Sequence, residues 1–333
     1  MKHWRVWAGV AVSLGSLYWA ARGVDFRSLA EALDRVRYLR LVAALAVFVL
    51  GQLARAYRWR LLFYPLEGIR LSRFFNVLNI GAMVNNVSPF RLGDVLKAYL
   101  CAELEQLSAA RALSTVAVER IVDTLTIVIL LVLLIPSISL PATLVGPTLG
   151  VGVVTVSAVL VLFLIAAHKE RSLALLDRLL QRYRFRGDEW LRGMVNSAVD
   201  GLACLGSLRT AAGVLTLSVV IWVGAALQFH LVMWAADLSL PFAAALTALC
   251  LTSLGMVVPS SPGYVGVFES LTIVALSLFD VGRDVALSYA LVLHAFGYLA
   301  LGILGVLGLW SEGYSYAALR TVVGRTRGRS EST

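Results

Sequence analysis

Charged side chains recur at a regular spacing just after a break in an otherwise apolar stretch. In the run Pro89-Phe-Arg-Leu-Gly-Asp-Val-Leu-Lys97, the proline and the glycine predict the end of one helical element and the start of another. Arg91, Asp94 and Lys97 recur every third residue, so they are predicted to share one helical face. A phosphate near that helix start would meet free backbone N–H groups as well as Arg91 and Lys97. The motif predicts an anion-binding site; the alternative is an interfacial helix whose cations contact lipid headgroups.

A second group of charges, Glu119, Arg120 and Asp123, precedes only a short uncharged run before Pro136. The group is therefore predicted to lie within the membrane. Glu119 and Asp123 are four residues apart, so like charges on one face repel unless a cation or a proton lies between them. Arg120 or Arg91 is predicted to be that cation. The alternative is a structural cluster of salt bridges that holds the neighbouring broken helix.

Glu269 lies seven residues after Pro262 and is the only acidic residue between Asp237 and Asp280. A carboxyl group at membrane depth costs about 2.5–3.5 kcal/mol on insertion scales. Glu269 is therefore predicted to pair across the fold, to be protonated, or to face a water-filled cavity. It is a candidate proton carrier; the alternative is a carboxyl group hydrogen-bonded to the broken backbone of residues 260–263.

Further polar residues complete the candidate site. Asn86 and Ser261 lie beside the two breaks in the apolar pattern and are added to the headgroup-binding set. Arg58 and His294 are secondary candidates. Arg55 and Arg58 share a helical face and are predicted to extend to the inner membrane interface, and His294 is predicted to be a core histidine rather than a proton relay. The cysteines lack metal-ligand spacing, and we expect no metal and no cofactor.

These charges stand out because the chain is strongly apolar. Hydrophobic residues make up 59% and charged residues 15% of its 333 residues, whereas soluble proteins average about 25% charged. The mean hydropathy is +0.82. A water-soluble fold is excluded, and an all-α, polytopic integral membrane protein is predicted. The net charge of +9 is assigned to cytoplasmic loops rather than to nucleic-acid binding.

The apolar blocks predict about eight transmembrane helices plus re-entrant or broken helices. Clear spans are predicted at residues 4–21, 41–64, 121–140, 142–167, 211–236 and 285–310. Two other stretches are interrupted: 74–89 carries four asparagines and ends at Ser88-Pro89, and 243–279 contains Pro259-Ser-Ser-Pro-Gly263. Such a break must be covered by protein or line a wet cavity.

Basic residues predict the orientation of the chain. They are concentrated in segment 168–210 and in tail 312–333, which places both termini in the cytoplasm. We predict one integral membrane domain over residues 1–333, containing a first pseudo-repeat at 41–140 and a second at 211–311.

The two interrupted stretches resemble each other. Gly81-Ala-Met-Val followed by Ser88-Pro-Phe-Arg-Leu-Gly93 matches Gly255-Met-Val-Val followed by Ser261-Pro-Gly-Tyr-Val-Gly266. On the predicted orientation, one break is entered from the cytoplasm and the other from outside, so the units would be inverted copies. Inverted repeats with discontinuous helices are typical of alternating-access transporters.

Four motifs in a fixed order resemble a known family. Arg58-Trp-Arg, the run from Pro89 to Lys97, Glu119-Arg-Ile-Val-Asp123, and Pro259-Ser-Ser-Pro-Gly-Tyr-Val-Gly-Val-Phe-Glu269 resemble the lysylphosphatidylglycerol synthase transmembrane-region family, also called flippase-like domain proteins. The resemblance covers about residues 41–310. It implies an integral membrane protein that moves a lipid, or a lipid-linked group, between leaflets. The residues matched to motif positions are Arg91, Asp94, Lys97, Glu119, Arg120, Asp123 and Glu269.

The chain departs from the family's pattern in two ways. Tyr264 stands where the family often has a second glycine after Pro-Gly. In the best-known member the membrane domain precedes a soluble aminoacyl-transferase, whereas only a basic tail follows Trp310 here. We therefore expect a stand-alone member.

The leading hypothesis is a flippase that moves an anionic, aminoacylated or polyprenyl-phosphate-linked lipid by alternating access. Headgroup binding is assigned to Arg91, Lys97, Arg120, Asn86 and Ser261, and charge balance or proton coupling to Asp94, Glu119, Asp123 and Glu269. The expected partner is the lipid substrate, and a homo-oligomer is left open. One alternative is a membrane enzyme on polyprenyl phosphates with Ser260 or Ser261 as nucleophile near Glu269. Another is a structural or regulatory membrane subunit.

Overall fold

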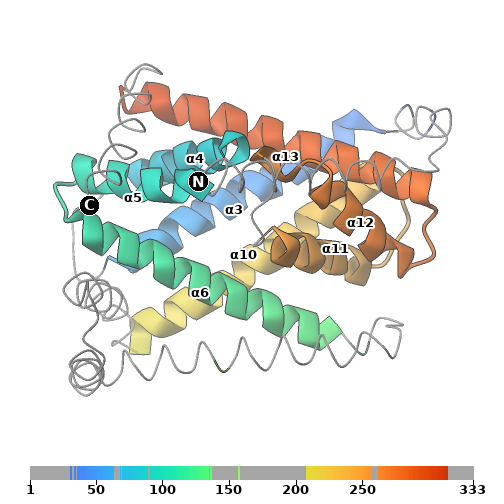
Figure 1. Ribbon diagram of the computed structural model, residues 1–333, viewed down its shortest axis with the longest axis horizontal. Coiled ribbons are helices and arrows are strands. Elements are labelled where there is room, and N and C mark those ends of the chain that lie inside the picture. The colour runs from blue at the N-terminus through green and yellow to red at the C-terminus, as the bar shows by residue number, and fades with distance from the viewer. Residues whose placement is uncertain are drawn as a thin grey trace, which may run out of the picture.

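A computed structural model gives the arrangement of the chain (Figure 1). It describes residues 31, 34, 36–63, 68, 70–88, 91–134, 136, 157, 208–256 and 262–313. Every regular element within these ranges is helical, so the predicted all-α class is confirmed. The predicted spans 4–21 and 142–167, nearly all of the basic segment 168–210 and most of the tail 312–333 lie outside the described residues.

The first group of helices begins with a short 3-10 turn that runs directly into a long helix. Its elements are η1 (Tyr38–Arg40), α3 (Leu41–Leu61), α4 (Leu71–Val87), α5 (Leu92–Leu104) and α6 (Ala109–Leu134). Helix α6 begins at residue 109 rather than at the predicted 121. The added segment contains good helix formers and neither proline nor glycine, whereas hydropathy had located only the apolar part. The charged group at 119–123 consequently lies in the middle of α6.

The second group has the same sequence of long and short helices. Its elements are α10 (Leu208–Ala235), α11 (Phe242–Gly255), the turn η5 (Pro262–Tyr264), α12 (Val267–Ser277) and α13 (Arg283–Ser311). Helices α10 and α13 match the predicted spans 211–236 and 285–310 to within three residues at each end.

Three helical segments in the described part of the chain are long and apolar enough to cross a membrane. They are Tyr38–Leu61, Arg209–Ala235 and Arg283–Ser311. Helix α6 has 26 residues and is about 39 Å long at 1.5 Å per residue, but it carries charges at its centre. The structure therefore agrees with a helical membrane protein, and the predicted total of about eight spans stays a prediction.

Both predicted breaks are present. Helix α4 ends at Val87, and the backbone of the next residue, Ser88, is extended (φ −110°, ψ 143°), because a following proline disfavours the helical conformation of the residue before it. Helix α11 ends at Gly255, and the chain re-enters α12 through Gly263 and Gly266, at φ 78° and 87°. These positive φ values are those that glycine adopts without a steric penalty.

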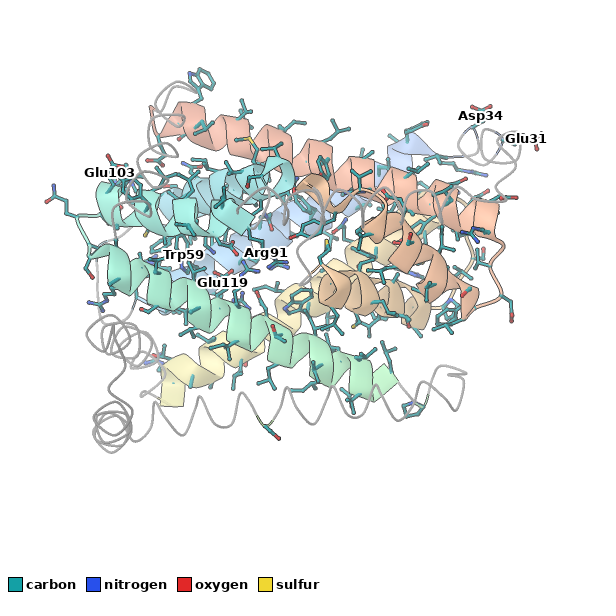
Figure 2. All side chains as sticks on the ribbon, in the orientation of Figure 1. Glu31, Asp34, Trp59, Arg91, Glu103 and Glu119 are labelled. Carbon is teal, nitrogen blue, oxygen red and sulfur yellow. The ribbon has the colours of Figure 1, made fainter. Side chains whose placement is uncertain are left out.

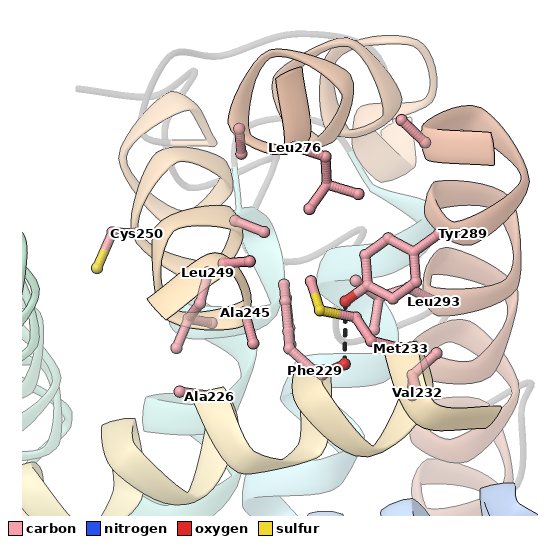
Figure 3. Packing of buried hydrophobic residues seen from close by; sticks show 14 of the residues in the cluster. Ala226, Phe229, Val232, Met233, Ala245, Leu249, Cys250, Leu276, Tyr289 and Leu293 are labelled. Carbon is pink, nitrogen blue, oxygen red and sulfur yellow. Dashed lines mark hydrogen bonds between the residues drawn. The ribbon is translucent and has the colours of Figure 1, made fainter. Parts of the chain in front are cut away.

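The described residues form two apolar cores, each built mainly from one group of helices. In the first, Trp59, Phe63 and Phe74 pack with ring centroids 5.0–5.7 Å apart. The second core joins α10, α11, α12 and α13 and also takes in residues of α6. Figure 3 shows this second core, where the hydroxyl of Tyr289 donates to the carbonyl of Phe229 at 3.0 Å. The first core likewise takes in Val214 of α10 and Leu309 of α13, so each core includes residues from both groups of helices.

The long helices of one group pack against helices of the other. Helices α3 and α10 run antiparallel, since Arg40 at the start of α3 bonds to Asp237 just after α10 at 2.9 Å. Helices α4 and α13 are also packed together, and the hydroxyl of Tyr298 donates to the carbonyl of Asn86 at 2.9 Å. Helix α6 reaches α11 in the same way. An inverted repeat predicts this exchange of helices, although the repeat itself stays a prediction.

Gly93 sets the close approach of α5 to α4 and provides a test of this packing. A Cβ atom there would overlap the carbonyl oxygen of Gly81 and lie 2.8 Å from the backbone nitrogen of Asn85. We expect Gly93→Ala to lower the free energy of unfolding by about 1–3 kcal/mol through overpacking. Thermal unfolding in detergent measures this.

The matched control is Gly51→Ala in α3, because a Cβ at Gly51 meets nothing within 4 Å. Alanine favours a helix over glycine, so this variant should unfold at the wild-type temperature or above it. Equal melting temperatures for the two variants would contradict the close approach of α5 to α4.

Candidate functional site

A cavity of about 350 Å³ is lined by both groups of helices. Its charged lining residues come from α3, α5, α6 and the first break, and they are Arg55, Arg91, Asp94, Lys97, Glu119 and Arg120. The opposite wall includes Gly263, Tyr264, His294 and Tyr298. In Figure 2, Arg91 and Glu119 lie near the middle of the molecule, whereas Glu103 lies at one end. Many of the sequence-predicted residues therefore line one cavity from separate helices, whereas Arg58, Asp123 and Glu269 are not among its lining residues.

Arg58 is the buried centre of the ion pairs. Its side chain is 0% exposed, and its Nη1 donates to Asp123 Oδ1 at 2.6 Å and to Ser218 Oγ at 2.8 Å. Its Nη2 lies 3.5 Å from Glu119 Oε1. The prediction that Arg58 extends to the membrane interface is wrong, because two carboxylates of α6 face it and a buried charge requires such partners.

Lys97 pairs with the other oxygen of Glu119. The distance from Lys97 Nζ to Glu119 Oε2 is 2.6 Å, and the ammonium group lies 4.6 Å from the ring centroid of Trp59. The cation that lies between Glu119 and Asp123 is thus Arg58. The prediction that Arg120 or Arg91 fills this place is wrong, and Arg120 comes only within 3.8 Å of Glu119. Sequence spacing along α6 could not show that α3 would deliver this cation.

Arg120 instead binds Asp94. Its Nε lies 3.3 Å from Asp94 Oδ2, and Asn85 donates to Asp94 Oδ1 at 3.1 Å. These contacts tie α4, α5 and α6 together at the rim of the cavity. Arg91 does not share the α5 face with Asp94 and Lys97, because α5 begins at Leu92.

Arg91 and Tyr264 connect the two breaks. They occupy the same position in the alignment of the two motifs, and both have left-handed backbone conformations, with φ 52° and 57°. Arg91 Nε donates to the Tyr264 hydroxyl at 3.3 Å. A glycine, common at the Tyr264 position in the family that the motifs resemble, would adopt this φ without strain. Tyrosine there provides a hydroxyl group that contacts the other break.

Glu269 and His294 form a separate pair, of which His294 lines the cavity and Glu269 does not. His294 Nδ1 lies 2.5 Å from Glu269 Oε1, and Glu269 Oε2 accepts the backbone N–H of Gly266 at 2.6 Å. Glu269 thus both pairs across the fold and stabilises the backbone at the start of α12. The backbone partner is Gly266, not residues 260–263 of the predicted alternative. The partner of Glu269 is His294, which the sequence had suggested only as a secondary candidate and had not paired with Glu269.

Arg55, Tyr264 and Tyr298 line the cavity and were not in the predicted set. Arg55 lies over the ring of Trp222, with its guanidinium carbon 5.2 Å from the ring centroid. Its spacing of three from Arg58 was the available signal. Tyr264 was detectable from its alignment with Arg91. Of the predicted residues, Asn86 lies on the lining and Ser261 lies outside the described residues.

Asp123 tests whether the buried ion pairs stabilise the fold. It accepts hydrogen bonds from Arg58 and from Trp222 Nε1, the latter at 3.0 Å. Asp123→Ala leaves a buried guanidinium short of a partner, so we expect the free energy of unfolding to fall by about 3–5 kcal/mol. The double variant Arg58→Met with Asp123→Leu should recover most of that loss.

The control for this prediction is Glu103→Ala, because Glu103 is an exposed carboxylate on α5. Chemical or thermal unfolding in detergent should leave this variant unchanged. If Asp123→Ala were as stable as Glu103→Ala, the ion pairs would not support the fold.

Comparison with known proteins is consistent with the motifs and the fold. The family model described as "Lysylphosphatidylglycerol synthase TM region" matches residues 6–305. No curated protein and no solved structure matches the chain. The match extends over both groups of helices and both breaks, and thus includes every described residue of the cavity's charged wall. The chain therefore belongs to the lysylphosphatidylglycerol synthase transmembrane-region family.

Proposed function

We propose that the protein is a lipid translocase of the cell (cytoplasmic) membrane, with both termini in the cytoplasm. It moves a lipid with an anionic, aminoacylated or polyprenyl-phosphate-linked headgroup between leaflets. The observation that carries this proposal is the cavity of about 350 Å³ lined by charged groups inside a helical membrane protein. Ionisable residues at membrane depth typically mark substrate pathways.

The cavity suits a headgroup rather than a whole lipid. Small-ligand pockets span about 300–1,000 Å³, and this one lies near the lower limit. Its charged groups would solvate a polar headgroup while the acyl or prenyl tails stay in the bilayer. A purely structural subunit would instead have its ion pairs sealed from any cavity, whereas Lys97, Glu119 and Arg120 here line one.

The contacts between the two breaks support alternating access. Arg91 of the first break bonds to Tyr264 of the second, and Tyr298 of α13 bonds to Asn86, so the first break is held by two hydroxyl groups that come from the second group of helices. Both are single hydrogen bonds, worth about 0.5–1.5 kcal/mol each for neutral partners and more for a charged one. A headgroup that binds Arg91 competes with Tyr264 and thereby loosens the link between the breaks.

Specific roles follow from the pairing. Arg91 and Arg120 hold the headgroup, with Asn86 and Ser261 as further polar contacts. Lys97 binds the headgroup only when the headgroup replaces Glu119 as its partner. Asp94, Glu119 and Asp123 balance the charges of the cations. Glu269 carries a coupling proton that it exchanges with His294, its partner at 2.5 Å.

Lipid movement in proteoliposomes tests the proposal. Purified protein should make an acyl-labelled fluorescent lipid in the inner leaflet accessible to an external quencher. Arg91→Ala should slow this about tenfold or more, because it removes a charge-assisted contact worth about 1.5–3 kcal/mol. Glu269→Gln should slow it as well, and its rate should lose its dependence on a pH gradient.

Arg60→Ala is the matched control, because Arg60 is an exposed arginine on α3. It should transport at the wild-type rate. Absence of movement for every anionic, aminoacylated or polyprenyl-phosphate lipid would overturn the proposal. So would movement that Arg91→Ala and Glu269→Gln leave unchanged.

A further inference from the structure

We infer that the cavity selects a headgroup that ends in a phosphate monoester and rejects a net-cationic aminoacylated one. The inference rests on the proposed function and narrows its substrate class. On the wall formed by α3, α5, α6 and the first break, charged residues either line the cavity or form ion pairs with residues that line it. The cations outnumber the carboxylates by two: Arg55, Arg58, Arg91, Lys97 and Arg120 against Asp94, Glu119 and Asp123.

Pairing identifies which cations make up the surplus. Arg58 binds Asp123, Lys97 binds Glu119, and Arg120 binds Asp94, each within 3.3 Å. These three pairs balance one another and hold α3, α5 and α6 together. The two remaining cations are Arg55 and Arg91.

Arg55 and Arg91 have no carboxylate partner within the described part of the chain. Arg55 is placed against the face of Trp222, and Arg91 against the hydroxyl of Tyr264. Both side chains line the same cavity but come from different elements, α3 and the first break. Two guanidinium groups with neutral partners thus line one cavity, and their charges are available to an anion that enters it.

The Glu269–His294 pair, of which His294 lines the cavity, does not cancel this surplus. Glu269 and His294 are paired with each other at 2.5 Å. If His294 is protonated, the pair carries no net charge and the surplus stays at two. If His294 is neutral, the pair carries one negative charge and the surplus falls to one. The cavity therefore keeps a positive surplus in either state.

A phosphate monoester matches two free guanidinium groups. It carries about −1.5 to −2 charges at pH 7 and has three strong acceptor oxygens, and arginine binds such oxygens in a bidentate geometry. A phosphodiester carries one charge and leaves one arginine unbalanced. An aminoacylated headgroup adds ammonium groups to a cavity that already has excess cations, where repulsion is stronger than in bulk water.

Transport of three lipids that share one labelled acyl chain tests this inference in proteoliposomes of the full chain. The probes are phosphatidic acid, phosphatidylglycerol and lysylphosphatidylglycerol. We expect phosphatidic acid to move about tenfold faster than phosphatidylglycerol, which corresponds to about 1.4 kcal/mol of differential binding. Lysylphosphatidylglycerol should not move above the protein-free rate.

Arg55→Gln should remove most of the preference for phosphatidic acid, whereas Arg55→Lys, which keeps the charge, should retain it. Arg60→Gln is the exposed control and should match the wild type. A melting curve in detergent for each variant confirms that it is folded. Retention of the full preference by a folded Arg55→Gln protein would overturn the role of Arg55 and with it the inference.

Competition identifies the source of the phosphate. Unlabelled polyprenyl monophosphate is added at a mole fraction equal to that of labelled phosphatidic acid. If it slows the transport of phosphatidic acid, the site accepts any lipid phosphate monoester. If it does not, the substrate is limited to the glycerol-linked form. Both results support the headgroup class. Inhibition by millimolar inorganic phosphate without movement of any lipid would identify a free anion as the ligand and overturn the inference.

The remaining outcomes separate this inference from the proposed function. If all three lipids move at equal rates and Arg91→Ala stops them, the protein is a translocase but the headgroup class is wrong. If lysylphosphatidylglycerol moves fastest, the charge argument fails while translocation stands. If no lipid moves, or if free phosphate is released and Ser261→Ala abolishes the release, the translocase function fails as well.

Discussion

The requirement that a charge buried among apolar helices must have a partner organises this protein. Arg58 is fully buried and contacts Asp123 and Glu119. Its contacts draw α3, α6 and α10 together at one point, since Ser218 of α10 also accepts from it. Lys97 extends the same chain of contacts to α5. Of this network, Lys97 and Glu119 line the cavity, whereas Arg58 and Asp123 are not among its lining residues. Replacing such a network by apolar side chains of similar volume is often neutral for stability.

A second constraint acts on the backbone. Where α4 and α11 end inside the helical bundle, the exposed peptide groups and the left-handed residues that follow need partners that a bilayer cannot supply. Side chains from the second group of helices meet part of this need at the first break. The hydroxyl of Tyr264 at the second break accepts from Arg91 at the first, and the hydroxyl of Tyr298 satisfies the carbonyl of Asn86. The cavity lies where the two breaks come together, since residues of both breaks are among its lining.

The sequence predicted the parts of this arrangement that depend on local chemistry. Proline and glycine marked both breaks, and the apolar blocks located α10 and α13 to within a turn. The sequence did not predict pairings between distant residues. Arg58 and Asp123 are 65 positions apart, and helical spacing carries no information about which helix faces which. Tyr264 shows an intermediate case, because its alignment with Arg91 existed in the sequence but its contact with that residue appears only once the two breaks meet in space. The start of α6 was misplaced because hydropathy reports apolarity, whereas the helix continues through polar residues that bind other helices.

The position of Arg58 has a mechanical consequence. One guanidinium group holds three long helices at a single buried point, and Trp222 of α10 donates to the same Asp123 oxygen. Sliding α3, α6 or α10 along its neighbours would separate a buried charged group from its partners. These three helices are therefore expected to keep their positions relative to one another. The short helices α5 and α12 have no such common anchor to one another in the described chain; each follows a break and is tied to its own long neighbour, α6 or α13. Because Lys97 ties α5 to Glu119 of the same network, an opening of the cavity that keeps these ion pairs intact would involve α12 rather than α5.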